Sequence, residues 1–190
     1  APHGIYYSGS NGLIEDNEFY GMTGPSGYGV QFHNNTSGLV NNNVFRGNIA
    51  RNNLSGLYCC RGVGNQIYNN VFYNNNNTGF WSAGEFSERR IFNNTIYGNG
   101  IGIRFDTRAP TNFRNNIIYG NTTNVVADRC GSAITASHNL CGTSHALCQH
   151  GINSSIVGNP LFVNPTATPP NFHLQATSPA IDIGEALPEV

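Results

Sequence analysis

Residues 56–76 read GLYCCRGVGNQIYNNVFYNNN, and related copies of this stretch recur along the chain. The copies begin at residues 4, 29, 56, 79, 102 and 124, so successive starts are 25, 27, 23, 23 and 22 residues apart. A repeat of that length is typical of solenoid proteins, in which each copy forms one coil. Every copy holds short runs of Val, Ile, Phe and Tyr broken by Gly or Asn, without helical periodicity. We therefore expect coils built from strands and turns alone.

Two patterns recur within the copies. In the first run apolar residues alternate, which places Leu57 and Cys59 inside the coil and Tyr58 outside it. The second pattern is an apolar residue, an Asn three positions later and a further apolar residue two positions after that. It occurs as Ile14, Asn17, Phe19; Val40, Asn43, Phe45; Ile67, Asn70, Phe72; Ile91, Asn94, Ile96; and Phe113, Asn116, Ile118. We expect the aligned Asn to sit in a turn, since Asn tolerates left-handed backbone angles, and to pass amide hydrogen bonds between coils.

These patterns predict an all-β fold: a right-handed parallel β-helix of about six coils over residues 1–142, with residues 143–190 forming a loop and C-terminal cap of the same domain. The handedness follows from the general rule for parallel crossovers. Leucine-rich repeats would need Leu where this chain has Val, Ile, Phe and Tyr, and calcium-binding nonapeptide rolls would need GGxGxD, which is absent. Because the chain starts within a repeat, we expect it to continue earlier coils of a longer protein.

The composition restricts the partners of this chain. Only 10% of residues are charged, the net charge is -1 and there is no basic run, so nucleic acid is not an expected partner. Thirty asparagines supply most of the polarity, and lysine is absent. No apolar run approaches the roughly 18 residues that a membrane span needs. Clustered cysteines in such a chain favour an oxidising setting, which means a secreted or cell-surface protein.

The chain has five cysteines, so at least one thiol is left over from any set of disulfides. Alternation places Cys60 on the outside. Cys130, Cys141 and Cys148 fall in an irregular segment, where a disulfide would staple a loop-rich end. One alternative is a zinc site that also uses His145 and His150, although the spacing fits no common finger pattern, and another is that these cysteines are free thiols.

The last segment carries a resemblance to a known family. Residues 159–184 read NPLFVNPTATPPNFHLQATSPAIDIG, and this is similar to the closing segment of secreted bacterial right-handed β-helix proteins of the pectate-lyase-like superfamily. The matching positions are Asn159, Pro160, Phe162 and Val163; Phe172, His173 and Leu174; and Ser178, Pro179, Ala180, Ile181, Asp182 and Gly184. The resemblance implies the fold and an extracellular, often carbohydrate-facing role, without fixing an activity. We expect Phe162, Phe172, Leu174 and Ile181 to close the open core.

Outward residues of one strand should form columns across the coils, and the first column is rich in aromatic residues. It contains Tyr6, Gln31, Tyr58, Trp81, Arg104 and Val126. Sugar rings pack their apolar faces on aromatic planes and hydrogen-bond to amide and guanidinium groups, so the column predicts a polysaccharide-binding face. Alternatively, aromatic residues simply suit strand surfaces, because a third column also holds many tyrosines: Tyr20, Arg46, Tyr73, Tyr97 and Tyr119.

A second column ends in two carboxylates. It contains Ser8, His33, Cys60, Ala83, Asp106 and Asp128. Asp106 and Asp128 would lie one coil apart, where they could divide into acid and base for glycoside hydrolysis or hold a calcium ion. Arg104 and His33 complete the predicted catalytic residues, while Arg108 and Glu85 join the predicted substrate-binding residues. The structural alternative is an Asp–Arg network on the surface.

A charged turn follows Trp81, with Glu85, Glu88, Arg89 and Arg90, and it is expected to be solvated or to form a wall of the same groove. Together the patterns predict an extracellular β-helix that recognises a polysaccharide and could cleave it as a glycoside hydrolase or lyase, with calcium as the one candidate cofactor. The alternative is a non-catalytic structural or adhesive β-helix segment of a surface protein, fibre or spike.

Overall fold

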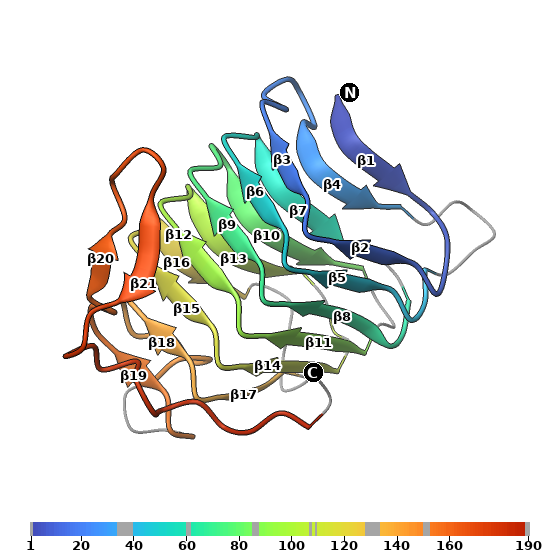
Figure 1. Ribbon diagram of the computed structural model, residues 1–190. Helices are drawn as coiled ribbons and strands as arrows, with labels where there is room; N and C mark the ends of the chain where they lie inside the picture. The colour runs from blue at the N-terminus through green and yellow to red at the C-terminus, as the bar shows by residue number, and fades with distance from the viewer. Residues whose placement is uncertain are drawn as a thin grey trace.

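A computed structural model shows that the chain is an all-β solenoid of parallel strands, which confirms the expected fold class (Figure 1). It describes residues 2–33, 40–59, 62–84, 88–106, 108, 110–127, 134–149 and 153–188. Strands β1 to β18 pass in turn through three sheets, which we call A, B and C, and strands one coil apart pair in parallel. The described residues contain no helix that could cross a membrane.

The three sheets run the length of the molecule. Sheet A consists of β1 (His3–Tyr7), β4 (Tyr28–Phe32), β7 (Ser55–Cys59), β10 (Thr78–Ala83), β13 (Ile101–Asp106) and β16 (Thr123–Val126). Sheet B consists of β2 (Leu13–Glu15), β5 (Val44–Arg46), β8 (Asn65–Tyr68), β11 (Arg89–Phe92), β14 (Thr111–Arg114) and β17 (Ile134–Ser137). Sheet C consists of β3 (Glu18–Tyr20), β6 (Ile49–Arg51), β9 (Val71–Tyr73), β12 (Thr95–Tyr97), β15 (Ile117–Tyr119), β18 (Leu140–Cys141) and β19 (Ile156–Val157).

The core is a stack of apolar side chains between the sheets. Phe45, Phe72 and Phe80 are fully buried, with ring centroids 6.3 Å apart for Phe45 and Phe72 and 5.9 Å apart for Phe72 and Phe80. Cys59 is buried among them, as alternation predicts. Burial on this scale is the dominant stabilising contribution in a solenoid, because each coil covers the apolar face of its neighbours.

Asparagine ladders join the coils, as expected. The backbone N–H of Asn48 donates to Oδ1 of Asn70 at 3.0 Å, and the backbone N–H of Asn70 donates to Oδ1 of Asn94 at 3.1 Å. The left-handed turn, however, belongs to the residue before each ladder Asn: φ is 55° at Asn69 and 53° at Asn93. The expectation that one Asn serves both purposes is therefore wrong. The ladder side chain must point into the protein, whereas the preceding residue turns the backbone.

The predicted register of the second copy is wrong by five residues. Phe45 pairs with Ile14 and Ile67, and Ala50 pairs with Phe19 and Phe72. The error arose because this coil has Asn43, Asn48 and Asn53 at five-residue intervals, so a shift by five residues still aligns an Asn, and because the aligned apolar position holds a small alanine. The outward column on sheet C accordingly contains Arg51, and Arg46 lies on sheet B.

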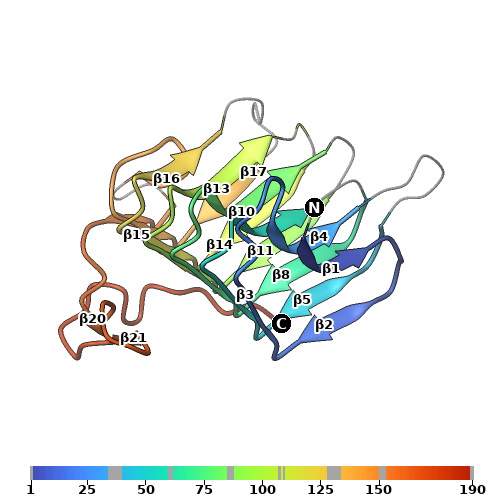
Figure 2. The ribbon, with the colours of Figure 1, turned by 90° about the horizontal axis from the view of Figure 1, so that it is seen from above.

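The C-terminal segment forms an antiparallel hairpin of β20 (Phe162–Asn164) and β21 (Asn171–Leu174). Both views show this hairpin outside the stacked coils (Figures 1 and 2). Phe172 packs on the outward rings of Tyr73 and Tyr97, with centroid distances of 5.5 and 5.3 Å. The expectation that Phe162 and Phe172 close the core is therefore wrong, because they cover the outer face of sheet C. Ile181 is also outside, with 41% of its surface exposed.

Candidate functional site

The outer face of sheet A carries the predicted first column in one continuous register. Tyr6 pairs with Gln31, Gln31 with Tyr58, Tyr58 with Trp81, Trp81 with Arg104 and Arg104 with Val126. Each of these residues lies between inward neighbours of its own strand, as alternation requires. The structure thus brings the predicted binding residues of this column onto one face.

The aromatic members of this column contact one another and a cation. The rings of Tyr58 and Trp81 lie 5.2 Å apart in an edge-on arrangement at 76°, and the guanidinium carbon of Arg104 lies 5.1 Å from the Trp81 ring centroid. Edge-on ring pairs and cation–π contacts each contribute about 1 kcal/mol, so they hold these side chains in place before any ligand binds.

Two further aromatic side chains, which the sequence analysis did not include, extend this row. His3 stacks on Tyr28 at 5.5 Å and lies 5.4 Å from Tyr6, while Tyr28 lies 5.2 Å from Tyr58. They occupy one register position, immediately before Gly4 and Gly29, and were missed because each copy was aligned from its glycine. Their shared position before an aligned Gly is the sequence signal that could have revealed them.

His33 completes the row at its N-terminal end. Its ring lies 4.9 Å from that of Tyr6, and its Nδ1 is 3.4 Å from Nε2 of Gln31. The row, which we call the aromatic strip, contains His33, Tyr6, His3, Tyr28, Tyr58, Trp81 and Arg104. It spans β1 to β13, four strand spacings or about 19 Å. A partly exposed row of this length suits an extended ligand better than a compact one.

Burial changes the titration of two members of the strip. Desolvation lowers the pKa of His3, so its imidazole is neutral at pH 7, and desolvation raises the pKa of Tyr28, which keeps its hydroxyl protonated. The permanent positive charge of the strip therefore lies at its Arg104 end. A ligand would meet neutral rings along most of its length and a cation at one end.

The predicted carboxylate pair is described only in part. Asp106 pairs with Ala83, as the second column requires, and lies partly exposed on the same face as Arg104. Asp128, Cys60 and Glu85 lie outside the described residues. Arg108, also predicted to bind substrate, is exposed. The roles of Asp106, Asp128, Arg104 and His33 in catalysis therefore stay predictions.

The C-terminal end of β10 is held by a buried arginine. Arg89 was expected in a solvated turn, yet its exposed fraction is 0%. It occupies the position that Asn65 has in the preceding coil, and it donates hydrogen bonds to Oγ of Ser82 at 2.8 Å and to the carbonyl oxygen of Ala83. A buried guanidinium needs such partners to offset its desolvation. Arg89 thereby positions the strand that presents Trp81.

The structure also tests the predicted disulfide and the alternative zinc site at the loop-rich end. Cys141 and Cys148 form a disulfide with their Cα atoms 6.1 Å apart, as expected for the loop-rich end. Because their sulfurs are bonded to each other, the alternative zinc site cannot use them. Cys130 and His150 lie outside the described residues. Within the described ranges, no three His, Cys, Asp or Glu side chains converge as a metal site would require.

Comparisons with known proteins support the fold and give the family. The structure is similar to the crystal structure of pectate lyase Pel9A, with a TM-score of 0.63 and 15% identity over 99% of this chain and 64% of that one. The likeness supports the right-handed parallel β-helix, and the chain spans less than two thirds of that protein. No match is found among curated proteins. Residues 1–159 match the family model described as "Periplasmic copper-binding protein (NosD)". Since that match covers most of the chain, this protein belongs to the NosD family.

Proposed function

We propose that this protein binds a polysaccharide along the aromatic strip of sheet A. The observation that carries the proposal is the unbroken run of ring contacts from His33 to Trp81, ending in the guanidinium of Arg104. Sugar rings pack on such surfaces, and Gln31 and Arg104 supply the polar contacts that a glycan needs beside the rings. The β-helix fold shared with a pectate lyase is consistent with this role without establishing it.

The proposal places the protein in the periplasm or outside the cell. The Cys141–Cys148 disulfide is compatible with an oxidising compartment, and the description of the family names the periplasm. That description also names copper. Copper sites use His, Cys and Met ligands. Within the described part of the chain, no three His, Cys, Asp or Glu side chains come together as a site with three such ligands would require.

Cleavage of the polysaccharide is a second candidate function, because Asp106 lies at the end of the strip on the same face as Arg104. A carboxylate at that place could donate or accept a proton beside a bound sugar, with Asp128 as its predicted partner. Arg108 and Glu85 are the further predicted substrate contacts. The alternative, a structural or adhesive segment, requires no turnover.

The experiment is a binding titration of neutral and uronic-acid polysaccharides by calorimetry, with Trp81→Ala as the test variant and Tyr119→Ala as the matched control. Tyr119 is a partly exposed tyrosine on sheet C, away from the strip. Loss of the Trp81 ring should weaken binding about tenfold or more, roughly 1.4 kcal/mol, while the control should bind normally. Equal affinities of the two variants would refute polysaccharide binding at the aromatic strip. Release of reducing ends or unsaturated products, abolished in Asp106→Asn, would show cleavage.

A further inference from the structure

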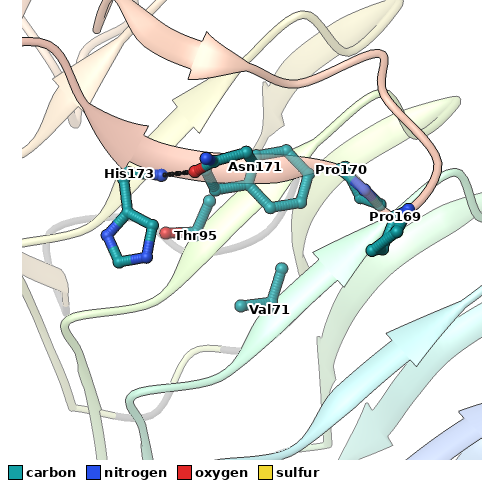
Figure 3. A pocket seen from close by; sticks show the side chains of 7 residues that line it. Val71, Thr95, Pro169, Pro170, Asn171 and His173 are labelled. Carbon is teal, nitrogen blue, oxygen red and sulfur yellow. Dashed lines mark hydrogen bonds between the residues drawn. The ribbon is translucent and has the colours of Figure 1, made fainter.

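The hairpin forms the roof of two hollows on the outer face of sheet C. One, of about 570 Å³, lies between β21 and the side chains of Val71 and Thr95 (Figure 3). The other, of about 390 Å³, lies under the hairpin turn of residues 165–170, and we call it the hairpin cavity. The two hollows share Pro169 and Pro170 in their walls. Both volumes are in the range of small-ligand sites.

The floor of the hairpin cavity is a Glu–Arg–Tyr triad that consists of Glu18, Arg51 and Tyr73. Nε of Arg51 donates to Oε1 of Glu18 at 2.5 Å, and the guanidinium carbon lies 4.5 Å from the ring centroid of Tyr20. Tyr73 follows Arg51 in the same column of sheet C. Within the described part of the chain, the Tyr73 hydroxyl and the terminal nitrogens of Arg51 have no protein hydrogen-bond partner. These groups are therefore available to a ligand.

A second triad of the same residue types, on sheet B, shows the contrast. Arg46 donates to Oε2 of Glu15 through Nε at 2.8 Å and NH2 at 2.7 Å, and its NH1 donates to the hydroxyl of Tyr68 at 3.1 Å. Glu15, Arg46 and Tyr68 also pair in register across three strands. In that triad the three side chains hydrogen-bond to one another. In the triad under the hairpin, the tyrosine hydroxyl and the terminal nitrogens of the arginine make no such bond within the described part of the chain.

We propose that the hairpin cavity is a second carbohydrate site, separate from the aromatic strip, that takes a neutral sugar unit. The charges of Glu18 and Arg51 are paired, so the floor offers no net charge to attract an ion. It offers donors and acceptors side by side, which the hydroxyls of a sugar can satisfy because each both donates and accepts. Pro169, Pro170 and the Tyr73 ring provide the apolar surface that packs on the C–H face.

The state of Tyr73 fits this role. Desolvation raises the pKa of Tyr73 above the ordinary value of 10.0, so its hydroxyl stays protonated and able to donate at neutral pH. The amides of Asn52 and Asn74 also line the cavity. Both residues are exposed at the coil corner, where an amide can contact a sugar without disturbing the buried ladders.

The test uses the Trp81→Ala chain, in which binding at the aromatic strip is weakened, so that binding at the hairpin cavity can be measured separately. Neutral tetrasaccharides of glucose, xylose, mannose and galactose are titrated and followed by ligand-observed NMR, with tetragalacturonate as the charged comparison. Tyr73→Phe removes one hydroxyl and keeps the ring that holds Phe172, and Tyr68→Phe is the matched control. We expect Tyr73→Phe to weaken binding of the best neutral sugar about three- to tenfold, the value of one hydrogen bond, with no change for Tyr68→Phe.

A second pair of variants separates recognition from folding. Arg51→Gln should weaken the same sugar, and Arg46→Gln should not, although each breaks one exposed ion pair. Three results would overturn the proposal: no neutral sugar binds the Trp81→Ala chain, tetragalacturonate binds more tightly than every neutral sugar, or Tyr73→Phe and Tyr68→Phe behave alike. None of these results bears on the aromatic strip, whose test is made on sheet A.

Discussion

At the scale of single residues, each ladder asparagine forms side-chain hydrogen bonds to backbone groups of the neighbouring coil at the turns, where strand pairing is interrupted. Asn70 has 1% of its surface exposed and lies between β8 and β9, where the chain turns from sheet B to sheet C. Its Oδ1 accepts from the backbone N–H of Asn48, and its Nδ2 donates to the carbonyl of Phe45 at 2.9 Å and to Oδ1 of Asn94 at 3.0 Å. Without this side chain, the buried backbone N–H of Asn48 in the preceding coil would have no partner.

Asn70→Ala should therefore destabilise the protein strongly. The change leaves the buried N–H of Asn48 without its partner, and it removes the hydrogen bonds that Nδ2 donates to the carbonyl of Phe45 and to Oδ1 of Asn94. Each buried unpaired group costs about 1 to 3 kcal/mol. We expect the free energy of unfolding to fall by about 3 to 5 kcal/mol in guanidinium titrations. Asn76→Ala, at an exposed asparagine of the same coil, is the control and should change it by less than about 0.5 kcal/mol. Equal effects of both variants would show that the ladder adds no stability.

At the scale of secondary-structure elements, the hairpin is attached to the coils through the rings of Phe162 and Phe172. Phe172 lies at the centre of a ring cluster that includes Phe162, at 5.3 Å, and the outward tyrosines 73 and 97 of sheet C. The strands of the hairpin pair with each other and join none of the three sheets. The ring contacts therefore carry much of the attachment.

Phe172→Ala should release the hairpin while the coils remain folded. Removing the ring takes away contacts that bury partly exposed apolar surface, about 2 kcal/mol of attachment. Hydrogen exchange should speed up over residues 162–174 and stay slow over β9 and β12, and proteases should cut near residues 165–170. Val163→Ala is the control, because Val163 lies on the same hairpin with 50% of its surface exposed. Slow exchange of the hairpin in Phe172→Ala would contradict this account.

The elements also show which features a sequence can predict. The strands of sheet A were placed correctly because five of the six have five or six residues with an alternating run beside an aligned glycine, and only one register buries its apolar set. Sheets B and C have strands of two to four residues between repeated asparagines, so a shift of five residues is not penalised locally. The hairpin contacts residues about 100 positions earlier, such as Phe172 with Tyr73, and nothing in its own residues identifies that surface.

At the scale of the whole molecule, the C-terminal tail docks on the last two strands of sheet B, β14 and β17. After β21 the chain runs back along the coils to β14 and β17 (Figure 1). There Asn115 donates through Nδ2 to the carbonyl of Glu185 at 2.9 Å and accepts from its backbone N–H at 3.1 Å. Oε1 of Glu185 accepts from Oγ of Ser137 at 2.7 Å and lies 3.3 Å from Nδ1 of His138 and 3.5 Å from NH1 of Arg114.

This contact should make tail docking sensitive to acid. Burial works to raise the pKa of Glu185, but the hydrogen bond from Ser137 and the charges of His138 and Arg114 outweigh it and hold the pKa below the ordinary value of 4.5. A lowered pKa in the docked state means that docking is fully stabilised above pH 4.5 and weakens as the pH falls through the lowered pKa. We expect the NMR signals of residues 183–188 to sharpen over that acidic interval, as the tail becomes mobile.

Glu185→Gln tests whether this one carboxylate is responsible. The variant keeps the backbone contacts to Asn115 but loses the charge that Arg114 and His138 stabilise, so its tail should be more mobile at pH 7 and change little between pH 5 and pH 3. Glu88→Gln, at an exposed glutamate elsewhere, should titrate like the unmodified protein. If the tail of Glu185→Gln still loosened in acid to the same extent, other carboxylates would control docking. The sharp dependence on one residue follows from geometry, because a single oxygen of Glu185 meets side chains from two adjacent coils at once.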